Sequence, residues 1–146
     1  MSEDQRAIDA LVHRFFAAFT NRQGRANVAS ARDLMIPEAV IVKNAGPSPE
    51  IYGVETFLGP REALLANGSL LDFEEEETSS RTDVHGNVAQ RLSLYRKSGV
   101  ASGTRFETRG VKTFQFIKTP AGWRIGAVAW DDERAGLSLL DRLPNA

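Results

Sequence analysis

The sequence predicts a single α+β domain over residues 1–146, in which a curved antiparallel β-sheet is wrapped by about three N-terminal helices. Two patterns carry this prediction. Apolar residues recur at helical spacing in the first part of the chain, whereas alternation with a period of two dominates the second half. Helices followed by a run of strands are typical of α+β folds, because parallel α/β folds alternate the two kinds of element.

The first expected element is a long amphipathic helix that ends near residues 21–24. Ser2, followed three positions later by Gln5, resembles a capping box at its start. Its apolar residues are spaced three or four apart, which predicts a broad stripe that packs across a sheet. They are Ile8, Leu11, Val12, Phe15, Phe16 and Phe19.

The segment after this helix is expected to hold two shorter helices and one strand. A second helix ends at Pro37, because proline disfavours helical backbone in the residue before it. A short strand is expected over 39–43 and a loop over 44–53. A third helix is expected over 56–66, either interrupted or started by Gly59-Pro60. We favour a start at Pro60, since proline is tolerated in a first helical turn.

Four strands joined by short turns are expected next, over residues 71–82, 88–97, 106–117 and 123–130. Gly126 lies inside the last of them, where glycine often marks a bulge or a bend. A short amphipathic tail is expected over 133–143.

The last hairpin suggests which side of the sheet is covered. Lys112, Phe114 and Phe116 share one parity, so their side chains point to the same face. We expect this face to line a hollow under the helices. The opposite parity is expected to face outward and to form a homodimer interface; it includes Val111, Thr113 and Ile117.

Composition excludes several classes of function. The net charge of -1 gives no basic field for nucleic acid or an anionic membrane. The chain has no cysteine, which removes disulfides and thiolate metal sites. No apolar leader and no run near 20 apolar residues is present, so we expect a cytoplasmic protein without a membrane partner. No cofactor and no metal site are expected.

Four stretches together resemble the nuclear transport factor two-like superfamily, a cone-shaped, cystatin-like fold that includes SnoaL-like cyclases and ketosteroid isomerases. They are AIDALVHRFFAAFTNR, AVIV, YGVETFLGPREALL and GVKTFQFIKTPAGWRIGAVAWDD. The resemblance implies a cone between helices and sheet that binds a small, mostly apolar molecule. It also implies a homodimer formed through the outer sheet face.

The catalytic positions known from that superfamily are not filled here by the required groups. The positions that match the isomerase tyrosine and its two acids hold Phe16, Asn44 and Lys112, none of which can do the same chemistry. The dehydratases of this fold use histidines on the sheet, whereas His13 is expected on a helix and His85 in a turn. The resemblance therefore predicts the fold and leaves the reaction open.

Several side chains are nevertheless candidates for a ligand site. Lys112, if buried, needs a partner, for which Glu74, Glu76 and Asp131 are expected candidates. Lys112 and Asp131 are the candidate proton-transfer groups. Candidate ligand-binding residues are Tyr52, Arg91, Tyr95, Lys112, Phe114 and Trp130.

Arg91 and Tyr95 lie on the same face of their strand, but Leu92 and Leu94 compete for the inner side. An inward Arg91 would bind a ligand carboxylate, and an outward one would form a salt bridge at a dimer face.

Three functions are consistent with these patterns. The first is a small-molecule-binding protein with a pocket between helices and sheet. The second is a lyase, isomerase or cyclase acting on a polyketide- or terpenoid-like substrate. The third is a dimeric module that binds other proteins without catalysis.

Overall fold

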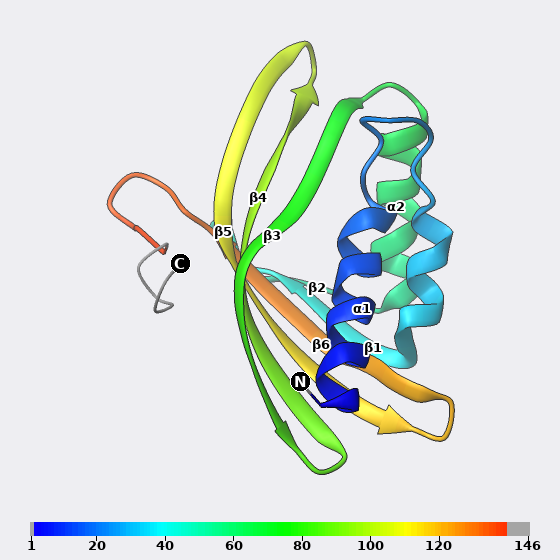
Figure 1. Ribbon diagram of the computed structural model, residues 1–146. Coiled ribbons are helices and arrows are strands. Elements are labelled where there is room, and N and C mark those ends of the chain that lie inside the picture. Colours follow the sequence, from blue (N-terminus) through cyan, green and yellow to red (C-terminus); the bar gives the residue numbers. More distant parts are fainter. Residues whose placement is uncertain (1, 140–146) are drawn as a thin grey trace.

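The computed structural model describes residues 2–139 (Figure 1). In chain order the elements are α1 (Glu3–Ala18), the 3₁₀-helix η1 (Val28–Leu34), β1 (Met35–Lys43), β2 (Glu50–Tyr52), α2 (Val54–Ala66), β3 (Leu70–His85), β4 (Val88–Ala101), β5 (Thr104–Thr119) and β6 (Gly122–Asp132). The sheet is strongly curved, and α1 and α2 both lie on its concave side. The predicted α+β cone is confirmed.

The six strands form one sheet in the order β2-β1-β6-β5-β4-β3. Strands β3 to β6 form the predicted antiparallel meander. One pairing differs from the expectation, because β1 runs parallel to β6. The chain between these two strands is long enough to cross over and return, which a parallel pair requires.

Ser2 caps the start of α1, but the second half of the predicted capping box does not form, because the Gln5 side chain donates to Asp9. The backbone N–H of Gln5 donates to the Ser2 hydroxyl at 3.0 Å, which satisfies one of the free amides of the first turn. The predicted apolar stripe of this helix is buried throughout. At its other end, the Asn21 side chain donates to the carbonyls of Leu65 and Leu70 and accepts from the N–H of Phe73. Asn21 therefore ties α1 to both α2 and β3.

Between α1 and β3 the predicted boundaries are partly wrong. The third helix begins at Val54, not at Pro60, because the Thr56 hydroxyl accepts the N–H of Gly53 and caps an earlier start. Strand β1 begins four residues before the expected Ala39 and includes Pro37. The expected loop contains the short edge strand β2, whose pairing with β1 the local proline-rich sequence does not reveal.

Strands β6 and β3 contain irregularities in their pairing with neighbouring strands. Gly126 is the extra residue between Ile125 and Ala127 in the pairing with β5, so the predicted bulge is confirmed. Strand β3 carries two more irregularities, before Glu74 and at Thr78. These bulges help the sheet to curve around the helices.

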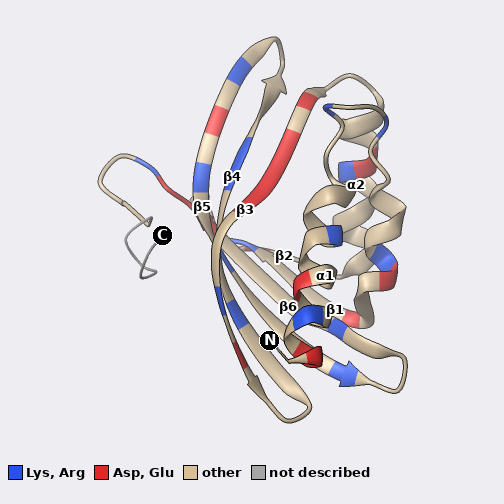
Figure 2. Ribbon diagram, in the orientation of Figure 1, with Lys and Arg blue, Asp and Glu red and all other residues tan. Residues whose placement is uncertain are grey.

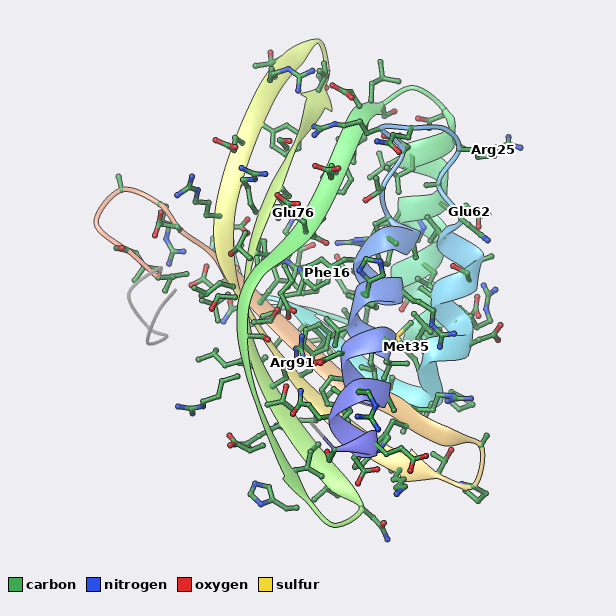
Figure 3. All side chains as sticks on the ribbon, viewed as in Figure 1. Phe16, Arg25, Met35, Glu62, Glu76 and Arg91 are labelled. Atoms are coloured by element: carbon green, nitrogen blue, oxygen red, sulfur yellow. The ribbon has the colours of Figure 1, made fainter. Side chains whose placement is uncertain are left out.

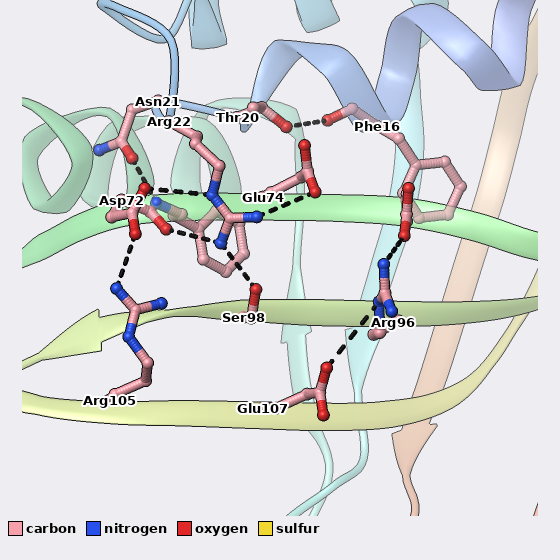
Figure 4. Close-up of polar contacts among 12 residues, drawn as sticks. Phe16, Thr20, Asn21, Arg22, Asp72, Glu74, Arg96, Ser98, Arg105 and Glu107 are labelled. Carbon is pink, nitrogen blue, oxygen red and sulfur yellow. Dashed lines mark hydrogen bonds and ion pairs between the residues drawn. The ribbon is translucent and has the colours of Figure 1, made fainter.

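Acidic side chains gather on β3, which is one of the two edge strands of the sheet (Figure 2). Arg22, just after α1, forms ion pairs with Asp72 at 3.1 Å and Glu74 at 3.0 Å and donates to the Ser98 hydroxyl (Figure 4). Arg105 of β5 reaches the same Asp72 carboxylate at 2.6 Å. These contacts hold the α1 end of the chain against the edge strand.

The C-terminal segment lies beyond β6. Arg134 and Leu137 form an isolated antiparallel bridge, and residues 133–139 contain no helix. The rest of the predicted amphipathic tail, residues 140–143, lies outside the described residues. Within residues 2–139 no helix is both long enough and apolar enough to cross a membrane.

Candidate functional site

A cavity of about 240 Å³ lies between the two helices and the inner sheet face. An apolar cavity near 150 Å³ holds a benzene ring, so this volume suits a molecule with one or two rings. Its walls are mostly aromatic and aliphatic, with five charged side chains among them. The lining residues are Phe15, Phe19, Lys43, Phe57, Arg61, Leu64, Leu65, Leu70, Phe73, Glu75, Lys97, Phe106, Lys112 and Trp130.

Lys112 enters this cavity from the middle of β5. It is only 3% exposed, and Phe114 and Phe116 on the same parity are also buried, so the predicted inner face is confirmed. The ammonium lies 3.3 Å from the Glu75 carboxylate, 4.2 Å from the centre of the Tyr95 ring and 4.4 Å from that of Trp130. The partner is therefore Glu75, and none of the three carboxylates expected from the sequence.

The surroundings of Lys112 alter its acidity. Burial lowers the pKa of the ammonium to about 8, because the charged form loses its hydration. The negative charge of Glu75 opposes this shift, and the positive charge of Lys97 adds to it. A neutral amine is consequently accessible near neutral pH, unlike that of a solvated lysine.

Tyr95 forms the floor beneath Lys112. Its ring lies over Gly110 on the next strand, and its hydroxyl donates to the Asp132 carboxylate on the strand beyond. Asp132 also pairs with Lys97 at 3.1 Å. Burial and this hydrogen bond raise the pKa of the Tyr95 phenol, so it stays protonated.

Gly110 leaves the space that the tyrosine needs. A Cβ atom at this position would collide with the Tyr95 hydroxyl and with the backbone carbonyl of Asp131.

Arg61 and Tyr52 lie at the α2 side of the cavity. The Arg61 guanidinium stacks over the Phe57 ring at 3.9 Å and lies 5.5 Å from Tyr52 and 5.9 Å from Trp130. The Tyr52 hydroxyl donates to Glu50 at 2.6 Å, and this hydrogen bond raises the pKa of the phenol. Tyr52 therefore packs against the cavity wall and supports Arg61, and it does not itself line the cavity.

Arg91 lies on the same inner face, which resolves the direction that the sequence left open (Figure 3). It donates twice to Glu77, at 2.5 and 3.0 Å, once to Asp9 of α1 at 2.6 Å and once to Thr82 at 2.9 Å. It lines a separate hollow of about 950 Å³ beside α1, together with the acidic run of β3 and His13. Arg91 thus joins α1 to β3 and does not reach the aromatic cavity.

Two other candidates are not at the cavity. Phe114 packs edge-on against Phe15 and Phe16 in the core beneath α1. Asp131 is opposite Val111, whereas its neighbour Trp130 is opposite Lys112, so Asp131 lies on the outer face. It pairs there with Arg134 at 2.6 Å. The structure therefore brings Lys112 and Trp130 together in the cavity and separates Asp131 from them.

Sequence reasoning missed Glu75, Lys97 and Arg61. Glu75 and Glu77 reach the inner face, but the bulges of β3 hide its register in the sequence. Lys97 did leave a signal, since it follows Arg91 and Tyr95 at even spacing. Arg61 lies one helical turn after Phe57. The expected helix start at Pro60 left Phe57 outside the helix, so the sequence did not place these two side chains on one helical face.

Comparisons with known proteins identify the fold. An NTF2-like protein with a cystatin-like fold from Novosphingobium aromaticivorans matches with a TM-score of 0.68 and 19% identity, over 99% of this chain and 86% of its own. An NTF2-like superfamily protein from Salmonella enterica matches at 0.74 and 15%, over 96% of each chain. A candidate aromatic ring hydroxylase from Novosphingobium aromaticivorans matches at 0.71 and 18%, over 88% of each chain.

These TM-scores show a shared fold, and identities this low leave the function open. No family model matches the sequence. No curated protein matches it either. The chain therefore has the nuclear transport factor two-like, cystatin-like fold, and its role must be argued from its own cavity.

Proposed function

We propose that this protein binds a small ring-containing molecule with one anionic group in the cavity between its helices and its sheet. The observation that carries the proposal is an aromatic cavity in whose wall, among the described residues, two of the four cations lack a carboxylate partner. Within residues 2–139, neither Arg61 nor Lys43 has a carboxylate oxygen within ion-pair distance, whereas Lys97 and Lys112 each have one.

Arg61 is the expected anchor for the anion. Its guanidinium is half-buried against aromatic rings, where a carboxylate would replace part of its lost hydration. A guanidinium also matches a carboxylate with two parallel hydrogen bonds. The rings of Phe57 and Trp130 would then hold the flat body of the ligand.

Binding of matched pairs of probes tests this proposal. Benzoate and naphthoate are compared with benzyl alcohol and naphthalenemethanol by isothermal titration calorimetry. We expect the carboxylates to bind at least about tenfold more tightly, because an ion-paired contact in a dry pocket is worth more than 1.4 kcal/mol. Arg61→Met should remove this preference, and Arg81→Met, on the exposed part of β3, should not. Equal binding of acids and alcohols, or no binding of either, would refute the proposal.

A second candidate function is catalysis on the bound molecule as a lyase, isomerase or cyclase. It is favoured by the Lys112–Glu75 pair, which places an amine of lowered pKa beside a carboxylate inside an apolar cavity. Asp131 has no part in this proposal because it lies on the outer face.

A homodimer through the outer sheet face completes the proposal. The centre of that face carries small and apolar side chains in register across four strands, namely Val42, Ala129, Thr113 and Leu92. Nearby Val40 and Ile117 are exposed. An Ala129→Arg variant should shift the mass measured by light scattering from dimer to monomer. A wild-type protein that is monomeric at all concentrations would exclude the dimer.

A further inference from the structure

The geometry around the Lys112 amine suggests chemistry beyond binding. Its side chain is 4% exposed to bulk solvent, yet it lines a cavity large enough for an organic ligand. Two aromatic rings, Tyr95 and Trp130, flank the amine within 4.4 Å of their centres. A ligand in the cavity would therefore meet a primary amine that bulk water does not surround.

Glu75 gives this amine a route for protons. Its carboxylate is 3.3 Å from the amine and lines both the aromatic cavity and the larger hollow beside α1. A proton taken from Lys112 can thus pass through Glu75 to the hollow without crossing the ligand. Asp132 is already bound to Tyr95 and Lys97, so Glu75 is the acid that is placed for this task.

The charge state of the amine agrees with this geometry. With the pKa of Lys112 at about 8, roughly a tenth of the amine is neutral at pH 7. At the same pH, an amine in water with the ordinary lysine pKa would be neutral in only about one molecule in 2,500. Desolvation of a lysine in an apolar pocket is a recognised way to make it a nucleophile.

We infer that Lys112 is a nucleophilic lysine that forms a reversible imine with an aldehyde or ketone bound in the cavity. This inference rests on the proposed function, because it uses the same cavity, and it names the carbonyl group as the reactive part of the ligand.

The reaction is balanced without any further reagent. Lys112 first gives one proton to Glu75, and the neutral nitrogen then bonds to the carbonyl carbon. The former carbonyl oxygen takes up a proton from this nitrogen, and the resulting hydroxyl leaves as water with the proton that Glu75 received from Lys112. The ammonium and the carbonyl compound together yield a protonated imine and one water molecule, so nothing is oxidised or reduced. Lys112 forms the bond to the ligand, and Glu75 transfers the proton to the hydroxyl that leaves.

Borohydride trapping tests the inference. The full chain is incubated with benzaldehyde or para-carboxybenzaldehyde, reduced with sodium cyanoborohydride, and mapped by peptide mass spectrometry. We expect a single secondary amine at Lys112, formed at least about tenfold faster than at the exposed Lys118. Lys112→Arg should abolish the adduct while it keeps a cation opposite Glu75, and Lys118→Arg should leave it unchanged. Labelling spread evenly over surface lysines would overturn the inference.

The role of Glu75 has its own readout. Glu75→Gln should alter the pH dependence of trapping, because the relay group is removed, and should not merely lower the yield at every pH. An unaltered pH profile would remove Glu75 from the mechanism.

Parallel titration with benzoate separates this inference from the proposed function. If benzoate binds and no adduct forms at Lys112, the imine is excluded and the binding proposal stands. If Lys112 is labelled and benzoate does not bind, the anion preference is excluded and the nucleophile stands.

Discussion

Two buried cations lie on the inner face of the same sheet, and their surroundings differ. Arg91 on β4 and Lys112 on β5 are 5% and 3% exposed, and their strands pair directly. Arg91 donates four hydrogen bonds to three side chains from α1 and β3. Lys112 has one carboxylate partner, two flanking rings and an open cavity in front of it.

The difference shows how one sheet face serves two purposes. A guanidinium with its donors satisfied on several sides fixes the distance between a helix and a sheet. An ammonium with spare donors keeps a site able to accept a ligand and to lose a proton. The residue types agree with these roles, since arginine keeps its charge when buried and lysine does not.

Loss of Arg91 should have the largest effect on stability. Arg91→Met leaves the carboxylates of Glu77 and Asp9 without their cation, and breaking a buried ion pair typically costs about 3–5 kcal/mol. Urea denaturation would measure this loss in the free energy of unfolding. Arg81→Met, which removes an exposed arginine, should change it by less than about 0.5 kcal/mol. A loss below about 1 kcal/mol at Arg91 would contradict its structural role.

The Lys112 pair should be less costly to break and easier to replace. Lys112→Met leaves Glu75 buried without a partner, so we expect a loss of about 2–4 kcal/mol. Adding Glu75→Gln should restore at least half of it, because no unpaired charge remains.

The matching double change, Arg91→Met with Glu77→Gln, should restore less, since Asp9 is still unpaired. Double-mutant cycles measure both couplings. If the second substitution restored the same fraction of the lost stability in both pairs, the proposed difference between the Arg91 and Lys112 sites would be wrong.

A substitution at Gly110, beneath Lys112 and Tyr95, should have a smaller effect on stability. Gly110→Ala forces a methyl group against Tyr95 and the sheet backbone, and such overpacking costs about 1–3 kcal/mol. Gly59→Ala is the matched control, because a Cβ in this part of α2 meets no atom within 4 Å. Gly59 precedes Pro60, whose ring disfavours a Cβ on the preceding helical residue, so the gain in helix propensity is offset and we expect a change below about 0.5 kcal/mol. The thermal unfolding midpoint should therefore fall in Gly110→Ala and change little in Gly59→Ala.

The smallest expected effect is a dependence of the free energy of unfolding on alkaline pH, which should come from Lys112 and not from Arg91. The pKa of Lys112 is lowered to about 8 by folding, so above that pH the unfolded chain binds more protons at this residue than the folded protein. Its contribution to the free energy of unfolding should rise by about 1 kcal/mol between pH 8 and pH 9.

The rise continues until the unfolded lysine also titrates, and below pH 8 the full penalty of the buried charge is present. The double variant Lys112→Met with Glu75→Gln is the reference. The difference between the free energies of unfolding of the wild type and of this variant, measured against pH, gives the contribution of the Lys112 pair. Arg91 remains protonated throughout and should add no slope of its own. A flat difference would contradict the lowered pKa.

The sequence allowed the meander, the α1 stripe and the inner parity of β5 to be predicted, because each depends on local periodicity. Lys112 was predicted in this way, because it shares the parity of Phe114 and Phe116, whereas Trp130 was chosen for its place at the end of the last strand. The sequence could not show β2, which exists only through its pairing with β1.

Longer-range features of the site were also beyond local reasoning. The partner of Lys112 depends on the irregularities of β3, which move Glu75 and Glu77 to the inner face. Asp131 lies outside the cavity because it is one residue after Trp130, and neighbouring residues of a strand point to opposite faces of the sheet. A single-residue slip reverses such an assignment, and no local pattern fixes it.

The absence of a side chain at Gly110 constrains how the sequence can evolve. Tyr95 crosses this position to reach Asp132, so the three residues form one unit that spans β4, β5 and β6. A descendant that acquires any larger residue at 110 must shorten the aromatic residue at 95, and the acid at 132 then loses its hydroxyl partner. Related sequences should therefore change at these three positions together, even where the remainder of the cone has diverged.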